Sequence, residues 1–241
     1  MKTEALLRQE MERLLYEVKT VVARHPAPAL PAARWRGHGV LLGPDTDILI
    51  EGFPRSANSF AVAAFGMAQP GPVGIAHHIH APAHVIAAVR DRVPAMVLAR
   101  DPEDAVLEFV IARPYLTPRQ ALRGFLRFYE PLLPYRGGFV VGDFPQVTTD
   151  FGEVVERVNA LFGAAFVPFE HTPTNESACF EAMDRFWRGK VDGETLERIV
   201  GRPSSVRDAM KARLEAVYRS PELAALRRRA EDLYRVFRGA R

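Results

Sequence analysis

The sequence contains one cysteine, Cys179, so it can form neither an intramolecular disulfide nor a cysteine-based metal site. This scarcity fits a reducing compartment, and we expect a cytoplasmic protein. No apolar run reaches the roughly 18 residues of a membrane-spanning helix, and we expect neither a signal peptide nor a membrane anchor at the start of the chain. Internal repeats and low-complexity tracts are also missing. These absences lead us to expect a globular protein without stable membrane insertion.

The composition is that of an ordinary α/β protein. The chain has 241 residues, of which 48% are hydrophobic and 25% charged, enough for one domain over 1–241 with a sizeable core. Its 32 basic residues are mostly arginine, and the net charge is +3. Most of these arginines belong on solvated helix faces, but their planar fork suits phosphate and sulfate oxygens, so we expect an anionic ligand. Aromatic residues do not alternate with a basic patch, which argues against nucleic acid as a partner.

The first segment predicts an amphipathic helix, because residues 3–24 place apolar side chains at helical spacing. We assign residues 1–25 to this helix. Its polar face carries glutamate as freely as arginine, which argues against an anionic membrane surface and favours packing on the main body or on a second subunit. A homodimer is therefore possible. The prolines between His25 and Pro31 predict a linker after the helix.

Short apolar runs alternate with helical patterns over residues 46–165. The expected strands are 47–53, 73–79, 95–99 and 138–143, and the expected helices are 58–68, 83–92, one from 102, 118–133 and 150–162. Strands separated by helices form a parallel sheet with helices on both faces. Residues 166–241 are expected to be mainly helical. The fold class is therefore α/β, with helices added at both ends of the core at 46–165.

The first strand runs into a loop with the features of an anion cradle. Ligands of parallel α/β sheets lie at the carboxyl ends of the strands, where residues 52–60 are located. Ser56, Asn58 and Ser59 supply hydroxyl and amide donors at a helix start, and Arg55 adds a positive charge. The nucleotide triphosphatase motif is not met, since its second glycine and its lysine are missing. The alternative is a proline-containing turn before a capped helix.

Two further segments stand at the ends of the next strands: His78-Ile-His80-Ala-Pro and Arg100-Asp-Pro. Together with Gly52-Phe-Pro-Arg-Ser-Ala-Asn-Ser-Phe60, and with weaker echoes at residues 142–145 and 160–163, they resemble the sulfotransferase family that uses 3′-phosphoadenosine 5′-phosphosulfate (PAPS). The resemblance covers residues 46–165 in the family's order. It implies a fold like that of P-loop nucleoside triphosphatases, PAPS as co-substrate and no metal.

The resemblance also implies roles for individual residues. His80 matches the general base, Arg55 the basic residue at the transferred sulfuryl group, and Arg100 the arginine of the 3′-phosphate; His78 falls where cytosolic members carry lysine. Phe60 matches the bulky residue that flanks the adenine. The residues that match the loop around the 5′-phosphosulfate are Pro54, Arg55, Ser56, Ala57, Asn58 and Ser59.

There are two departures from the family pattern. Ala57 replaces a glycine, which is tolerable only if its φ is not strongly positive. Glu108 replaces the serine that donates to the 3′-phosphate, and a carboxylate there would repel a phosphate. Either Glu108 turns away, or another cation compensates for it, or the donor is not standard PAPS. Arg202, in the late loop Gly-Arg-Pro-Ser-Ser, is one such cation, although that loop reads equally well as an ordinary capped helix start.

Three questions stay open at this point. The function could instead be that of another nucleotide-dependent transferase or kinase on the same fold, or of an inactive nucleotide-binding protein. The acceptor is a small molecule or a glycan of unknown identity. The aromatic residues of the late helices could line its pocket or belong to the core: Tyr115, Phe125, Phe128, Tyr129, Phe180, Phe186 and Trp187. His78 and His80 would share one face of a strand, yet without a third ligand we expect no metal site.

Overall fold

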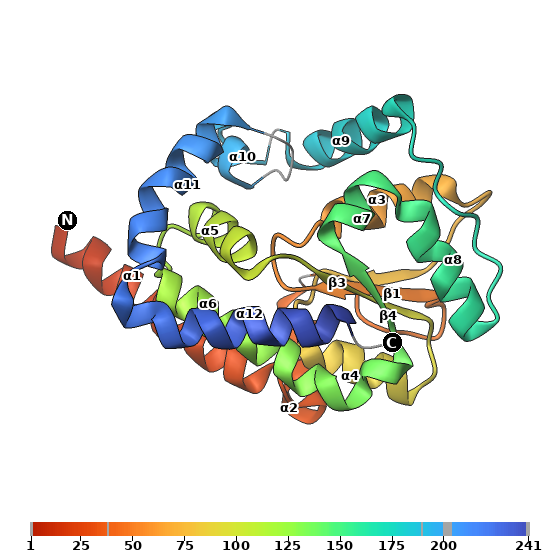
Figure 1. The fold of residues 1–241 in the computed structure, drawn as a ribbon, viewed down its shortest axis with the longest axis horizontal. Helices are drawn as coiled ribbons and strands as arrows, with labels where there is room; N and C mark the ends of the chain where they lie inside the picture. Colours follow the sequence, from red (N-terminus) through yellow and green to blue (C-terminus); the bar gives the residue numbers. More distant parts are fainter. Residues whose placement is uncertain (1, 38, 189, 200–203, 240–241) are drawn as a thin grey trace.

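The centre of the molecule is a parallel sheet. The computed structural model describes residues 2–37, 39–188, 190–199 and 204–239. The strands are β1 (Ile48–Gly52), β2 (Ile75–His77), β3 (Ala95–Ala99) and β4 (Val140–Asp143), in the order β2-β1-β3-β4 with every pair parallel. Figure 1 shows the sheet enclosed between helices. Strands that are buried on both faces need continuous apolar sequence, which explains the runs that predicted them.

Each face of the sheet has its own core. Ile48 and Ile50 point to one side of β1 and Leu49 to the other, so consecutive residues join different apolar clusters. The first face packs against α3 (Asn58–Ala68), α8 (Phe151–Phe162) and α9 (Pro173–Trp187). The second packs against α4 (Pro82–Arg90), α5 (Pro102–Ala112), α6 (Pro118–Tyr129) and α12 (Ala224–Gly239). The predicted fold class, a parallel sheet with helices on both faces, is confirmed.

Several helices begin at side-chain caps that the sequence supplies. Asp101 accepts from the N–H groups of Glu103 and Asp104 at the start of α5, and Thr117 forms a capping box with Gln120 at the start of α6. Asp150 caps α8 as expected. Helix α3 has no side-chain cap, and its N-cap residue, Ala57, is left-handed. Helix α4 also lacks a side-chain cap, but its N-cap residue, Ala81, is extended, so the left-handed N-cap distinguishes the start of α3.

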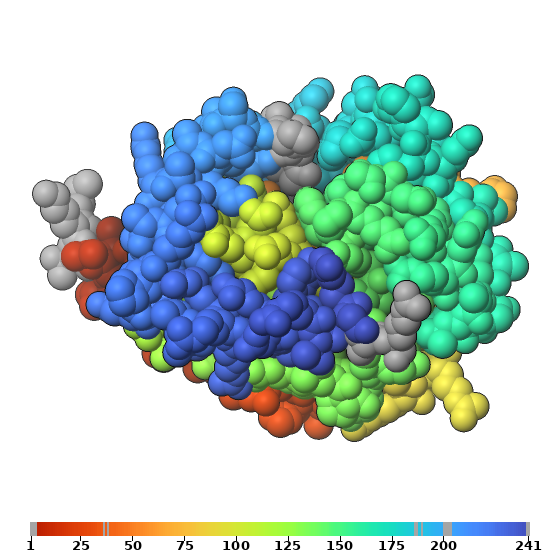
Figure 2. Space-filling view, in the orientation of Figure 1, coloured from red at the N-terminus to blue at the C-terminus, as the bar shows by residue number. Residues whose placement is uncertain are grey.

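The C-terminal helices fold back over the second face. Beyond β4 the chain forms α7 (Phe144–Thr149), and later α10 (Gly193–Ile199) and α11 (Ser205–Tyr218). Helix α11 packs on α5 and helix α12 on α6. Figure 2 shows these C-terminal helices, in blue, lying along α5. Short 3-10 helices, η1 (Glu130–Gly138) and η2 (Pro221–Leu223), connect the longer ones.

The first helix, α1 (Lys2–Val22), matches the prediction, but the linker after it was predicted wrongly. That segment is a second helix, α2 (Pro26–Arg36), which ends at Gly37 with a φ of 62°. Pro26 lies in the first helical turn, where a backbone N–H would make no intrahelical hydrogen bond, so proline loses none. Its fixed φ also favours the helix. Among the described residues, no helix has the length and apolar character required to cross a membrane.

Candidate active site

The loop of residues 53–57 turns the chain sharply from β1 into α3. Arg55 has a φ of 72° and Ala57 a φ of 66°, both in the left-handed region. A side chain there costs about 1–2 kcal/mol per residue, and such strain persists where the surroundings enforce it. Alanine in place of glycine is tolerable here only if its φ is not strongly positive, and that condition is not met. The loop holds its conformation without the glycine that would relieve the strain.

Buried hydrogen bonds hold this loop in place. The Tyr129 hydroxyl donates to the Leu98 carbonyl at 2.8 Å, accepts from the Phe53 N–H at 3.4 Å and lies 3.5 Å from the Ser56 hydroxyl. The Asn58 amide donates to the Phe53 carbonyl at 3.0 Å. Ser56 and Asn58 therefore use their side chains inside the loop. What they can offer a ligand is their backbone N–H groups.

Those N–H groups belong to the uncapped start of α3. The first N–H groups of a helix have no intrahelical acceptors, and the helix dipole adds partial positive charge there. The carbonyl of Ala57 already accepts from Ala61, so the helix proper starts at once behind the loop. Backbone N–H groups at such an end bind phosphate or sulfate oxygens. The site can therefore receive an anion.

Two arginines border the loop. Arg100, which follows β3, donates from Nη1 to the Arg55 carbonyl at 3.1 Å, and its guanidinium lies 4.0 Å from the ring centroid of Phe144, at the end of β4. The Nε atoms of Arg55 and Arg100 are buried, and neither has a hydrogen-bond partner among the residues that the structure describes. The structure thus brings Arg55 and Arg100 together, with donors left over for a ligand.

Glu108 joins this group from α5. Its Oε2 lies 3.1 Å from Nη2 of Arg55 and 3.3 Å from Nε of Arg207, in α11. Glu108 is 8% exposed, and Arg55 also donates to the Ile199 carbonyl at 2.5 Å. Of the alternatives left open for Glu108, the structure supports compensation by another cation. That cation is Arg207, which the sequence did not single out, whereas the expected Arg202 lies outside the described residues.

The histidine segment is tied to both ends of the loop. The Nδ1 atom of His80 lies 2.8 Å from the Gly52 carbonyl, and the Nε2 atom of His78 lies 3.0 Å from the Ser59 hydroxyl. Strand β2 ends at His77, and His78 and His80 have φ values of 60° and 52°. The expectation that both share one face of a strand is therefore wrong. The chain turns at each histidine, which is how it reaches the loop.

A buried carboxylate, Glu51, anchors this segment. It is 0% exposed and accepts from the N–H groups of Ile79 at 2.7 Å and His80 at 3.1 Å, and its Oε1 lies 3.1 Å from Nδ1 of His84. Burial raises the pKa of Glu51, but the hydrogen bond from His84 and the nearby imidazoles outweigh it and bring the pKa below its usual value. Sequence reasoning missed Glu51, although a lone acid inside an apolar strand was a visible signal.

The surroundings define the protonation of the two histidines. A carbonyl oxygen only accepts, so Nδ1 of His80 carries the proton to Gly52 and Nε2 keeps its lone pair. Burial lowers the pKa of His80, and Glu51 and the Gly52 carbonyl partly oppose this. Burial, with the neighbouring His80 and His77, lowers the pKa of His78 to about 3. His78 is therefore neutral at physiological pH and supplies no positive charge where the family carries lysine.

Comparison with known proteins adds a distant structural likeness. No family model and no curated protein matches this sequence. Among solved structures, mouse sulfotransferase SULT7A1 complexed with PAP is similar at 12% identity and a TM-score of 0.42. The match covers 78% of this chain and 90% of that one. Identity this low leaves the function to be inferred from the side chains of this chain.

The aromatic residues mostly belong to the core. Phe60 is 3% exposed and packs against Phe169, His171 and Phe180, so it lies inside the molecule, unlike a residue that flanks an adenine. Of the aromatic residues expected to line a pocket or the core, those of α6 are buried in the core: Phe125, Phe128 and Tyr129.

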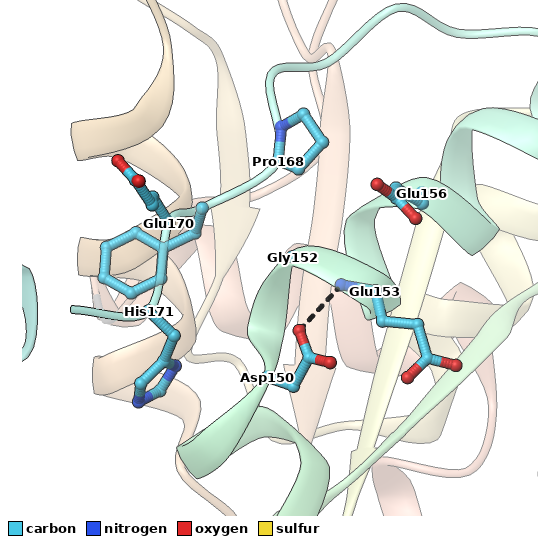
Figure 3. Close-up of a pocket in the computed structure, with 8 residues that line it drawn as sticks. Asp150, Gly152, Glu153, Glu156, Pro168, Glu170 and His171 are labelled. Carbon is cyan, nitrogen blue, oxygen red and sulfur yellow. Dashed lines mark hydrogen bonds between the residues drawn. The ribbon is translucent and has the colours of Figure 1, made fainter.

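A surface hollow of about 620 Å³ lies elsewhere, against the start of α8. Figure 3 shows Asp150, Glu153, Glu156 and Glu170 around it, with the Asp150 cap on the Glu153 N–H. None of its lining residues belongs to the loop or to the histidine segment. Carboxylates repel phosphate and sulfate, so this hollow does not suit the anion. Within the described part of the chain, no cluster of three or more potential ligands could hold a metal ion.

Proposed function

We propose that this protein is a sulfotransferase that moves a sulfuryl group from PAPS to a hydroxyl or amine of a small-molecule or glycan acceptor. The observation that supports this most directly is the bond between His80 and Gly52, because it holds a neutral imidazole at the mouth of an anion-binding loop. In the reaction the acceptor oxygen forms a bond to sulfur as the bond from sulfur to the bridging phosphate oxygen breaks. The acceptor proton passes to His80, and 3′-phosphoadenosine 5′-phosphate (PAP) leaves.

Arginines and backbone donors carry the electrostatic part of this proposal. Arg55 and the N–H groups at the start of α3 would hold the 5′-phosphosulfate and stabilise charge on the bridging oxygen. Arg100 would reach the 3′-phosphate. The guanidinium of Arg55 stays protonated, so it stabilises the leaving group without donating a proton. As in phosphoryl transfer, positioning and charge would supply most of the rate.

His80 would act as general base through Nε2. Glu51 is a positioning residue for it: the carboxylate accepts the His80 N–H and lies 3.8 Å from Nδ1, so it fixes the ring and favours the imidazolium that forms when the proton arrives. The imidazole is 25% exposed, which leaves it accessible to an acceptor. Its lowered pKa keeps the ring neutral, and therefore ready to accept a proton, at neutral pH.

One observation favours a second candidate function, a nucleotide-binding protein without turnover. Glu108 forms an ion pair with Arg55 at 3.1 Å, and a bound phosphosulfate would have to displace the carboxylate. A kinase is disfavoured because the carboxylates near the strand ends are engaged: Glu51 with the histidine segment, and Asp143 with Tyr234 and Arg238. Magnesium with a nucleoside triphosphate requires a carboxylate that can reach the ion.

Nucleotide binding is tested by calorimetry with PAP against ATP and magnesium. We expect PAP to bind and ATP with magnesium to bind at least about tenfold more weakly. Arg100→Ala should weaken PAP binding by about 10–100-fold, since it removes a charge-assisted contact. Arg235→Ala, at a guanidinium that is 75% exposed on α12, is the matched control and should change nothing. Equal binding of both nucleotides, or an unaffected Arg100→Ala variant, would refute the site.

Turnover is tested with PAPS over a panel of hydroxyl and amine acceptors. His80→Ala should lower turnover by about 10²–10⁴-fold and leave PAP affinity nearly intact, because a general base acts in the transition state. His25→Ala, at an exposed histidine before α2, serves as control. Full activity in His80→Ala would remove that residue from the mechanism. Tight PAP binding without sulfuryl transfer to any acceptor would favour the second candidate function.

A further inference from the structure

Helix α1 turns its apolar side away from the protein. Its large apolar residues are between 45% and 66% exposed: Leu6, Leu7, Met11, Leu14, Leu15, Val18 and Val21. A helix at the surface of a globular protein normally buries such residues against the core. Figure 1 shows α1 at the edge of the molecule, with its N-terminal end projecting beyond the other helices. Among the residues that the structure describes, nothing covers this exposed side.

The other side of α1 makes the contacts with the body, through Tyr16, which packs against Phe109, and through polar side chains. Glu17 and Thr20 accept hydrogen bonds from Nη1 of Arg127, in α6, at 2.5 and 2.8 Å. Arg13 donates to the Tyr115 carbonyl at 2.6 Å. These contacts span two turns of α1 and fix its rotation about its own axis. The apolar side is thus held outward by specific contacts.

The exposed residues follow the spacing of a helix–helix seam. Leu7, Met11, Leu14, Val18 and Val21 succeed one another in alternating steps of four and three. This spacing places the five side chains along one side of the helix, as in helices that pack side by side. The flank of this seam carries Glu12 as well as Arg8, which form a pair with each other, so it is not the basic flank that anionic lipids attract. The pattern therefore favours another helix.

The area fits association of two copies. With exposed fractions of 45–66%, the apolar residues of α1 leave on the order of 600 Å² uncovered, beyond the few hundred Å² that a monomer usually exposes in one patch and close to the roughly 800 Å² that each partner contributes to a stable interface. Closed two-fold dimers of identical chains are the commonest oligomers, and their interface uses the same surface on both copies. We propose that this seam of α1 packs against the same seam of a second copy of the chain. This inference goes beyond the sulfotransferase proposal and does not depend on it.

Sedimentation velocity of the full chain between about 1 and 50 μM tests the proposal. We expect a species of twice 26.9 kDa. Leu14→Glu should raise the dissociation constant by at least about 100-fold, because each dimer would then bury two unpaired carboxylates. The matched control is Val236→Glu, the introduction of the same charge at a residue that is 57% exposed on α12; it should leave the dimer unchanged. Since Leu14 is 61% exposed, its substitution should not unfold the chain, and circular dichroism checks this.

Two further arms complete the test. Leu14→Cys with a short bismaleimide should give a covalent dimer, while the parent chain should not react, because its one cysteine, Cys179, is buried. The vesicle arm uses phosphatidylcholine mixed with phosphatidylglycerol, to which we expect no binding. A monomer at every concentration, a dimer that survives Leu14→Glu, or a monomer that sediments with the vesicles would each overturn the proposal.

Discussion

Replacing Glu108 by glutamine should have opposite effects on stability and on ligand affinity. The carboxylate lies 3.1 Å from Arg55 and 3.3 Å from Arg207, and its side chain is only 10% exposed. Glutamine keeps the size of the side chain and removes the charge. In the free protein the arginines lose a charged partner in a poorly hydrated place. In the complex, the anion no longer competes with an internal carboxylate for Arg55.

The magnitudes follow from the strength of hydrogen bonds between charged groups. Such a bond contributes about 1.5–3 kcal/mol net, and glutamine keeps part of it, so we expect the free energy of unfolding to fall by about 1–3 kcal/mol. Release of Arg55 should raise the affinity for PAP by a comparable free energy, or about 10–100-fold, since 1.4 kcal/mol is a factor of ten. A mutation that merely loosened the fold would lower both quantities.

Urea unfolding and PAP calorimetry on the same preparations measure the two effects. Glu103→Gln is the matched control: it is the same substitution on the same helix, at a carboxylate that pairs with the 60% exposed Arg219, and both quantities should stay within error. If Glu108→Gln folds normally and binds PAP no more tightly than the parent chain, the carboxylate does not compete with the ligand, and the reasoning about this residue is refuted.

Two predictions concern backbone strain and pH. Ala57→Gly should raise the free energy of unfolding by about 1 kcal/mol, because its φ of 66° suits glycine; urea unfolding that shows no gain would contradict the strain. Burial lowers the pKa of His78 to about 3, below its unfolded value. As pH falls below about 6.5, His78 therefore binds a proton in the unfolded chain but not in the folded chain. The free energy of unfolding should fall by about 1.4 kcal/mol per pH unit, or about 2 kcal/mol by pH 5. His78→Asn should flatten this slope in urea unfolding at pH 5–7, and an unchanged slope would count against it.

Local sequence predicted the parts of the fold that local physics decides. The strand Ala95–Ala99 is a short apolar run between polar turns, and strands of buried parallel sheets typically have such continuous apolar sequences. The helix at Asn58–Ala68 follows from its apolar spacing. The prolines of α2 misled the prediction, because proline in a first turn favours a helix, and Pro31, inside α2, does not end it.

The candidate site was predictable only in outline. Arg55, His80 and Arg100 stand at strand ends, and parallel topology brings strand ends to one edge. The pairing of Glu108 with Arg207 depends on how α11 returns over α5, which no local pattern encodes. The left-handed φ of Ala57 is enforced by its surroundings. Glu51 was visible as an acid in an apolar strand, but its partners come from the segment after β2 and from α4.

Tyr129 and Arg127 lie two residues apart in α6, and each fastens a different part of the molecule to that helix. The Tyr129 hydroxyl forms hydrogen bonds with Leu98 and with Phe53 in the loop, while Arg127 forms a hydrogen bond with Glu17 in α1. Helix α6 therefore supports both the loop and α1. Damage to it would disturb the proposed nucleotide site and the proposed dimer contact at once. Variants that separate the two properties must be made in the loop or on the outer side of α1, and never in α6 itself.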